Sequence, residues 1–147
     1  MRRLATRLII MAIVLGGSWL SYQAADVTKC SGPKAEAWAE STLRRREAAS
    51  KDYDSITLYT TYSQYALLEG RAEERYRSQV AQETPGCLNE LQDLSVQFLY
   101  AEWKAYDAAS DSNFELAAQY DDESIKALEA MEREFDRLAA KYRWELD

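Results

Sequence analysis

Helix-breaking residues are almost absent from the longest part of this chain. Pro33 and Pro85 are its only prolines, and between them the only glycine is Gly70. A strand-rich domain of this length needs many turns, which are rich in glycine and proline, yet the whole sequence contains only 5 glycines. Hydrophobic residues make up 47% of the chain, which is enough to bury a core. We therefore predict an all-α fold.

Two polar breaks divide the helical sequence, at residues 84–86 and 110–113. Between and after them, apolar residues recur with the 3–4 spacing of amphipathic helices and coiled coils. Opposite charges four residues apart would lie together on exposed helix faces. Five such pairs are Glu40–Arg44, Glu47–Lys51, Glu73–Arg77, Asp122–Lys126 and Glu129–Arg133.

The last predicted helix has the longest apolar stripe. Its members share one face at helical spacing, and we expect that face to pack on the core. They are Phe114, Ala118, Asp121, Ile125, Leu128, Phe135, Tyr142 and Leu146, with Met131 and Leu138 widening the stripe.

The two cysteines, Cys30 and Cys87, decide between two helical arrangements. A single helix over 33–83 would be about 76 Å long and would hold the cysteines far apart, whereas a disulfide needs Cα atoms within about 7 Å. A reversal near 50–54, where several capping residues occur, would bring the cysteines together.

We therefore predict an antiparallel bundle of four helices closed by an intramolecular disulfide. The expected helices cover roughly 33–50, 54–83, 85–109 and 112–146. The alternative is a long hairpin of three helices with disulfides between chains.

The N-terminus carries a targeting pattern. Arg2, Arg3 and Arg7 precede the apolar segment Leu8–Leu20, and the first acidic residue is Asp26. Positive charge on the N-terminal side of an apolar segment predicts that the N-terminus stays in the cytoplasm and that the rest is exported. Export would also place the cysteines where a disulfide persists.

We divide the chain into a signal peptide or signal anchor, 1–25, and an extracytoplasmic helical domain, 26–147. The small residues at 16–18 fit a cleavage site. An uncleaved anchor through Leu8–Tyr22 is the alternative, although about 22 Å of helix is short for a bilayer core.

Composition excludes several classes of function. The chain has 18 Lys+Arg against 25 Asp+Glu, a formal net charge of -7, and no histidine. Nucleic-acid binding through phosphates needs a cationic surface, so we expect none. The lack of histidine removes the Ser-His and Cys-His nucleophile pairs and the usual zinc and di-iron ligand sets. We predict no cofactor, no metal site and no catalytic residues.

Tyrosine is the most unusual residue type, with 10 copies. Tyr59, Tyr62 and Tyr65 would share one helix face at i, i+3, i+6, and Tyr76 follows further along. Tyrosine suits both the boundary of a core and an interface, since it has an apolar body and a polar tip. Core-boundary packing is one interpretation of these four residues, and a recognition face is the other.

Three consecutive arginines, Arg44, Arg45 and Arg46, interrupt the acidic domain. Consecutive residues point in different directions around a helix, so solvation and local pairing are the simplest expectation. If the protein is anchored, contact with anionic lipid is the alternative.

These observations predict a non-catalytic extracytoplasmic interaction module: an adaptor, inhibitor, chaperone-like protein or accessory subunit of an envelope complex, with a protein partner. One alternative is a bundle that senses a small molecule. The other is an envelope enzyme that uses carboxylates, for which 121–123 supplies neighbouring acids.

Overall fold

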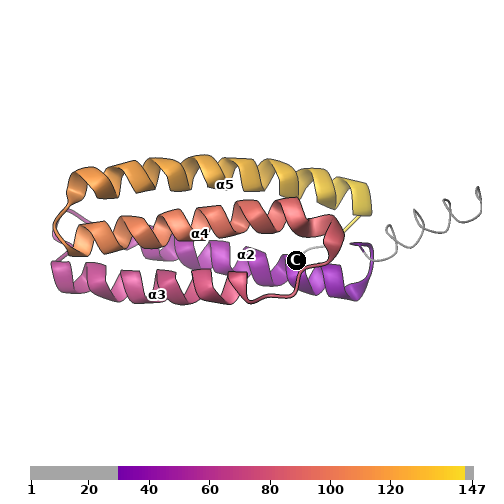
Figure 1. The fold of residues 1–147 in the computed structure, drawn as a ribbon, viewed down its shortest axis with the longest axis horizontal. Helices are drawn as coiled ribbons and strands as arrows, with labels where there is room; N and C mark the ends of the chain where they lie inside the picture. Colours follow the sequence, from indigo (N-terminus) through magenta and orange to yellow (C-terminus); the bar gives the residue numbers. More distant parts are fainter. Residues whose placement is uncertain (1–29, 145–147) are drawn as a thin grey trace, which may run out of the picture.

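The structure is a computed structural model that describes residues 30–144, and within them it consists of helices and connecting turns (Figure 1). The helices are α2 (Pro33–Asp54), α3 (Tyr62–Val80), α4 (Asn89–Ser110) and α5 (Phe114–Tyr142), with a 3-10 turn, η1 (Gly86–Leu88), before α4. The predicted export or anchor segment lies outside the described residues. Within residues 30–144 no helix is long and apolar enough to cross a membrane.

The first chain reversal lies at 55–61 rather than near 50–54, so the first helix is longer than expected. Asp52 is not a cap: it is buried within α2 and accepts hydrogen bonds from Arg71 and Arg75. The N-cap of α3 is Thr61, whose side chain accepts from the Gln64 N–H in a capping box. The second helix therefore begins eight positions later than 54, at Tyr62.

The other breaks lie close to their expected positions. Segment 81–88 connects α3 to α4, and 111–113 connects α4 to α5. The Asn113 side chain caps α5 by accepting a hydrogen bond from the Leu116 N–H at 3.2 Å. The helix ends at Tyr142, because Arg143 adopts a left-handed conformation with φ of 54°.

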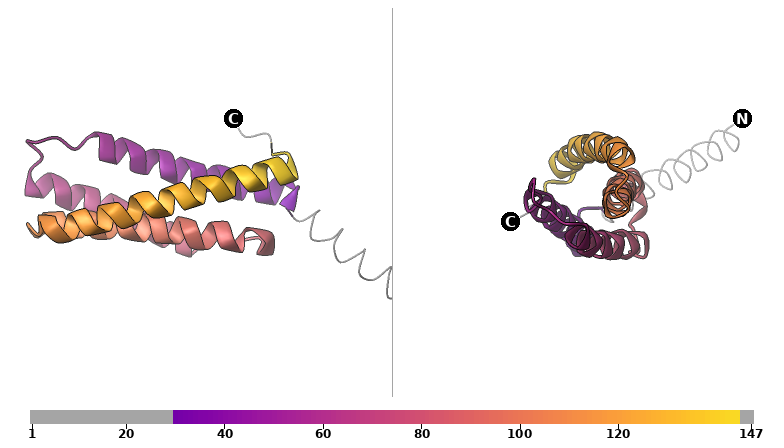
Figure 2. Two further views of the ribbon diagram at one scale, coloured as in Figure 1. Left: turned by 90° about the horizontal axis from the view of Figure 1, so that it is seen from above. Right: turned by 90° about the vertical axis from the view of Figure 1, so that its left-hand side faces the viewer.

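The four helices run antiparallel, which confirms the predicted four-helix bundle (Figures 1 and 2). Cys30 and Cys87 form an intramolecular disulfide with a Cα–Cα distance of 6.4 Å. Helix α4 makes the most extensive contacts, with α3 on one side and α5 on the other. The disulfide and both ends of the described chain lie at one end of the bundle, and the 55–61 and 111–113 turns lie at the other (Figure 1).

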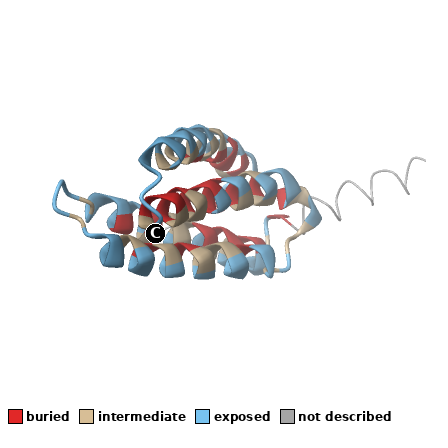
Figure 3. Cartoon of the chain, turned by 60° about the vertical axis from the view of Figure 1, so that its left-hand side comes forward, coloured by how far each residue is buried: buried red, intermediate tan, exposed pale blue. Residues whose placement is uncertain are grey.

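Most of the large buried side chains lie toward the disulfide end of the bundle. Buried residues lie on the faces that the helices turn toward one another, while 55–61 is largely exposed (Figure 3). One continuous cluster of large side chains joins α2, α4 and α5, and burial of such side chains stabilises by about 1.5–3 kcal/mol each. It includes Trp38, Leu88, Leu91, Phe98, Leu99, Met131, Phe135, Leu138 and Trp144.

Candidate functional site

The half of the bundle near the 55–61 turn contains a cavity. A cavity of about 490 Å³ lies between the second half of α2, α4 and the first half of α5. Its α2 wall includes Ala49 and Ser50, and its α4 floor includes Ala105 and Ala109. These small side chains leave space that large side chains fill in the other half of the bundle. We call this cavity the groove.

The predicted apolar stripe of α5 forms one wall of the groove. Phe114, Ala118, Ile125 and Leu128 line it, and Phe114 and Ile125 remain about half exposed. The expectation that the stripe packs on the core is correct only for its second half, where Met131, Phe135 and Leu138 are buried. Leu146, the last member of the predicted stripe, lies outside the described residues. An apolar wall without a packing partner is typical of a binding surface.

A buried ion-pair network lies beside the groove. The Arg75 guanidinium donates to Asp52 Oδ2 at 2.6 Å and to Glu102 Oε1 at 2.7 Å. Arg71 donates to the other Asp52 oxygen at 2.9 Å. The side chains of Arg75, Asp52 and Glu102 are each about nine-tenths buried. Because removal of one member would strand a buried charge, this network couples α2, α3 and α4.

Two polar atoms of groove-lining residues on α4 have no hydrogen-bond partner among the described residues and almost no solvent-accessible surface. They are Oε2 of Glu102 and the hydroxyl of Tyr106, which lie one helical turn apart. Glu102 is 7% exposed and Tyr106 is 4% exposed. Buried polar atoms are nearly always paired, so these two atoms are exceptions, although neither is exposed to the open space of the groove.

The groove also shifts the protonation equilibria of its acids. Burial raises the pKa of Glu102 against the opposing effect of the Arg75 charge. Partial burial, and then the charge of Asp122, raises the pKa of Asp121 on the facing wall. Burial, and then the charge of Glu102, raises the pKa of Tyr106. All three groups therefore favour their uncharged forms more than the same groups in water do.

Exposed large apolar and aromatic side chains gather at the turn end. We call this group the aromatic tip, and its members are Leu58, Tyr59, Tyr62 and Phe114. Leu58 is fully exposed and Tyr59 is 89% exposed. The rings of Tyr62 and Phe114 lie 6.3 Å apart and join the two turns. No charged residue occurs from 55 to 68, although 29% of the chain is charged. This uncharged run was available in the sequence and would have marked the tip.

The structure does not place Tyr59, Tyr62 and Tyr65 on one helix face. Tyr59 belongs to the 55–61 turn, because α3 begins at Tyr62. Tyr65 lines the groove.

Tyr76 lies further along α3, with its ring stacked on Trp103 and tilted against Tyr100, at centroid distances of 5.5 Å. Tyr76 therefore packs against α4, whereas Tyr59 and Tyr62 are open to solvent.

The three arginines have separate polar partners. Arg44 pairs with Glu40 on the surface, as the sequence predicted. Arg45 donates to Ser78 and Gln79 on α3 and to Gln82 just after it, and Arg46 donates to Glu132 on α5. The side-chain contacts join α2 to its neighbours, and contact of these arginines with lipid stays a prediction.

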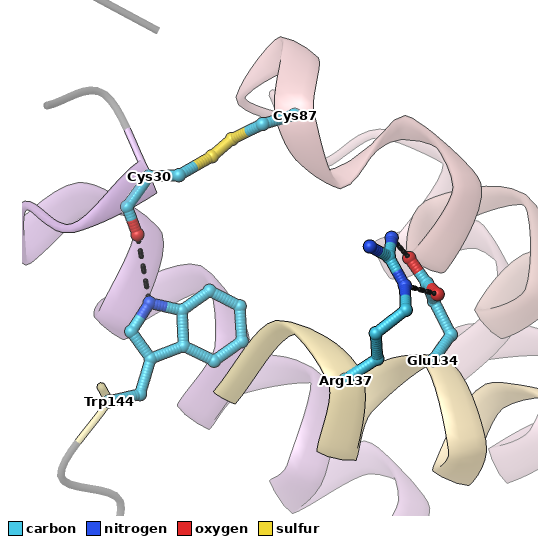
Figure 4. The surroundings of a disulfide bond; sticks show 5 residues. All are labelled: Cys30, Cys87, Glu134, Arg137 and Trp144. Carbon is cyan, nitrogen blue, oxygen red and sulfur yellow. Dashed lines mark hydrogen bonds and ion pairs between the residues drawn. A yellow bond between two sulfur atoms is a disulfide. The ribbon is translucent and has the colours of Figure 1, made fainter. Parts of the chain in front are cut away.

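The disulfide end is closed by polar contacts. The Trp144 indole donates to the backbone carbonyl oxygen of Cys30, and Arg137 donates two hydrogen bonds to the buried Glu134 (Figure 4). Among residues 30–144, no group of three histidine, cysteine, aspartate or glutamate side chains is placed to hold a metal ion.

Comparison of the chain with protein-family models, curated proteins and solved structures gave no match. Any functional conclusion therefore depends on the groove and the aromatic tip themselves.

Proposed function

We propose that this chain is an exported, non-catalytic interaction module that binds a protein partner through its aromatic tip. The observation that carries the proposal is the exposure of Leu58 and Tyr59 within an uncharged run of an acidic protein. Large apolar side chains that are this exposed have no role in the core, and aromatic residues are enriched at the centres of protein interfaces.

The position of the tip supports the proposal. Cys30, where the described chain begins, lies at the opposite end of the bundle. A signal anchor that precedes Cys30 would therefore hold the disulfide end near the membrane, and the tip would point away from it. The disulfide itself is consistent with an oxidising, extracytoplasmic compartment.

Site-specific photo-crosslinking in intact cells tests the proposal. A p-benzoyl-phenylalanine at position 59 should give a discrete crosslink to one protein. The same residue at position 80 is the matched control, because Val80 is also an exposed apolar residue of the α3 region but lies at the disulfide end. A crosslink that forms when the probe is at position 59, and does not form when the probe is at position 80, would support a partner at the tip.

Substitution of the tip separates binding from folding. Leu58→Ser with Tyr59→Ser should abolish co-purification of the crosslinked protein, while the melting temperature stays within a few degrees of the parent. Crosslinks only to lipid, equal crosslinks at positions 59 and 80, or retention of the partner by the double variant would each contradict the proposal.

A further inference from the structure

Charge is distributed unevenly along the bundle. No lysine or arginine occurs in residues 52–70 or in residues 105–125, although the chain has 18 of them. The same two stretches contain nine aspartates and glutamates. They include the 55–61 and 111–113 turns and the adjoining ends of all four helices (Figure 1). The aromatic tip therefore lies at an end of the molecule that carries excess negative charge.

The cations next to these stretches are already paired. Each of the four forms an ion pair with an acid at 2.8–2.9 Å. The pairs are Lys51–Glu47, Arg71–Asp52, Lys104–Asp107 and Lys126–Asp122. None of these cations is therefore available to the remaining acids of the turn end.

Three exposed acids lie beside the tip, and we call them the acidic border. Asp54 directly precedes the 55–61 turn, Asp111 lies in the other turn, and Glu115 follows Phe114. Within residues 30–144, the side chains of these three acids have no ion pair and no hydrogen bond. The acidic border therefore places uncompensated negative charge next to the exposed apolar side chains of the tip.

The disulfide end has the opposite feature. Lys34, at the start of α2, and Lys141 and Arg143, at the end of α5, have no acid within ion-pair distance in the described part of the chain. The excess negative charge is therefore a property of the turn end, and not only a consequence of an acidic composition.

This arrangement specifies the charge of a surface that fits the tip. Protein interfaces typically combine an apolar and aromatic centre with a polar rim. A partner with acids on its rim would meet like charge at the acidic border, whereas lysines and arginines would be complementary and would speed association. A membrane surface that contains anionic lipids is disfavoured for the same reason.

Starting from the proposed function of the tip in binding a protein, we propose that its partner presents a basic surface. An apolar pocket of the partner takes the side chains of Leu58 and Tyr59. Lysines and arginines around that pocket pair with the acidic border.

Four synthetic peptides of equal length test the proposal against purified exported protein. Three have the same leucines and tryptophan, separated by lysines, by glutamines or by glutamates, and the fourth has lysines with serines in place of the apolar residues. Fluorescence anisotropy should show the apolar lysine peptide binding at least about tenfold more tightly than each of the others. Equal affinity of the lysine and glutamine peptides would overturn the proposal, and so would equal affinity of the two lysine peptides.

A triple variant locates the charge. Asp54→Asn, Asp111→Asn and Glu115→Gln together remove the acidic border at exposed positions, so the fold should be retained, which circular dichroism checks. The affinity of the apolar lysine peptide should fall to within about twofold of that of the glutamine peptide. An unchanged preference for lysine would overturn the proposal.

A second triple variant is the matched control. Glu83→Gln, Asp93→Asn and Asp136→Asn remove the same number of charges from exposed acids in the half of the bundle toward the disulfide. The control should retain the preference for lysine, and an equal loss in both triple variants would overturn the proposal.

Ionic strength provides a test that needs no substitution. Raising it from about 0.01 M to about 1 M shortens the Debye length from about 30 Å to about 3 Å. The preference of the parent for the apolar lysine peptide over the glutamine peptide should then largely disappear, and a preference that does not depend on salt would contradict the charge pairing.

Crosslinking in intact cells separates the two proposals. With p-benzoyl-phenylalanine at position 59, the acidic-border variant should lose most of the protein crosslink that the parent gives, and the control variant should keep it. A crosslink retained in full by the acidic-border variant would overturn the basic partner and leave the tip as the binding surface. The absence of any protein crosslink from the parent would instead contradict the proposed function itself.

Discussion

The indole N–H of Trp144 donates a hydrogen bond to the backbone carbonyl oxygen of Cys30 at 2.8 Å, across 114 positions of sequence. The contact joins the last described residue to the first. It depends on the left-handed conformation of Arg143, which turns the chain back after α5 so that the indole packs edge-on against Phe135. The residues that follow α5 therefore bring Trp144 beside Cys30 at the disulfide end of the bundle.

Substitution of Trp144 should separate its packing from its hydrogen bond. Trp144→Phe retains most of the apolar contact but leaves the buried carbonyl oxygen without its donor, so we expect a loss of about 1 kcal/mol in the free energy of unfolding. Trp144→Ala also loses the ring and should cost about 3–5 kcal/mol. Urea denaturation monitored by circular dichroism measures the free energy of unfolding of both variants. A loss below about 0.5 kcal/mol for Trp144→Ala would contradict this packing.

The disulfide should provide a large part of the stability. It closes a loop with a sequence separation of 57, for which the chain-entropy model gives about 4 kcal/mol. Cys30→Ala with Cys87→Ala removes the bond without placing a hydroxyl in the buried Cys30 position, and we expect a melting temperature lower by many degrees.

Non-reducing mass spectrometry of exported protein should identify the Cys30 and Cys87 peptides linked within one chain. Two free thiols, or a link found only between chains, would contradict the bundle and favour the three-helix hairpin.

The buried ion pairs should be far more important than the exposed ones. Arg75→Ala leaves the buried Asp52 and Glu102 without their shared partner, and we expect a loss of about 3–5 kcal/mol in the free energy of unfolding. Arg77→Ala is the matched control two residues away on the same helix, since it removes only the exposed pair with Glu73 and should cost less than about 0.5 kcal/mol. Similar losses for the two variants would show that the network is not desolvated.

Local sequence rules predicted the helical fold well, because they describe interactions between near neighbours. All five predicted i,i+4 ion pairs form. The break at 84–86 separates α3 from α4, and the cysteines lie close enough to bond. The first reversal was misplaced because Asp52 resembles a cap in sequence but pairs with arginines on α3. The better local signal was the Thr61–Gln64 capping box.

The groove could not be predicted in the same way. The periodicity of α5 shows which face is apolar, but not whether a partner helix fills the space opposite that face. Whether that space is filled depends on the small side chains of Ala49, Ser50 and Ala105, which line the same cavity only in the folded bundle. Glu102 likewise looks like any helix-surface acid in sequence. Its burial and its pairing with Arg75 are long-range properties.

Tyr106 should make stability depend on alkaline pH. Burial, and then the charge of Glu102, raises its pKa in the folded protein, while the unfolded value is about 10. The folded state therefore favours the protonated phenol. Its contribution is complete below the unfolded pKa and is lost as the pH rises from about 10 toward the higher folded pKa, because only the unfolded chain then ionises.

Tyr106→Phe removes this dependence and also removes a buried hydroxyl that has no partner among the described residues. At pH 8 we expect the variant to be at least as stable as the parent. Near pH 11 the parent should have lost roughly 1 kcal/mol relative to the variant. Urea titrations at the two pH values measure the difference, with Tyr59→Phe, which removes one phenol from an exposed position, as the matched control. If the difference in the free energy of unfolding between the parent and Tyr106→Phe does not change with pH, the Tyr106 phenol is not buried as described.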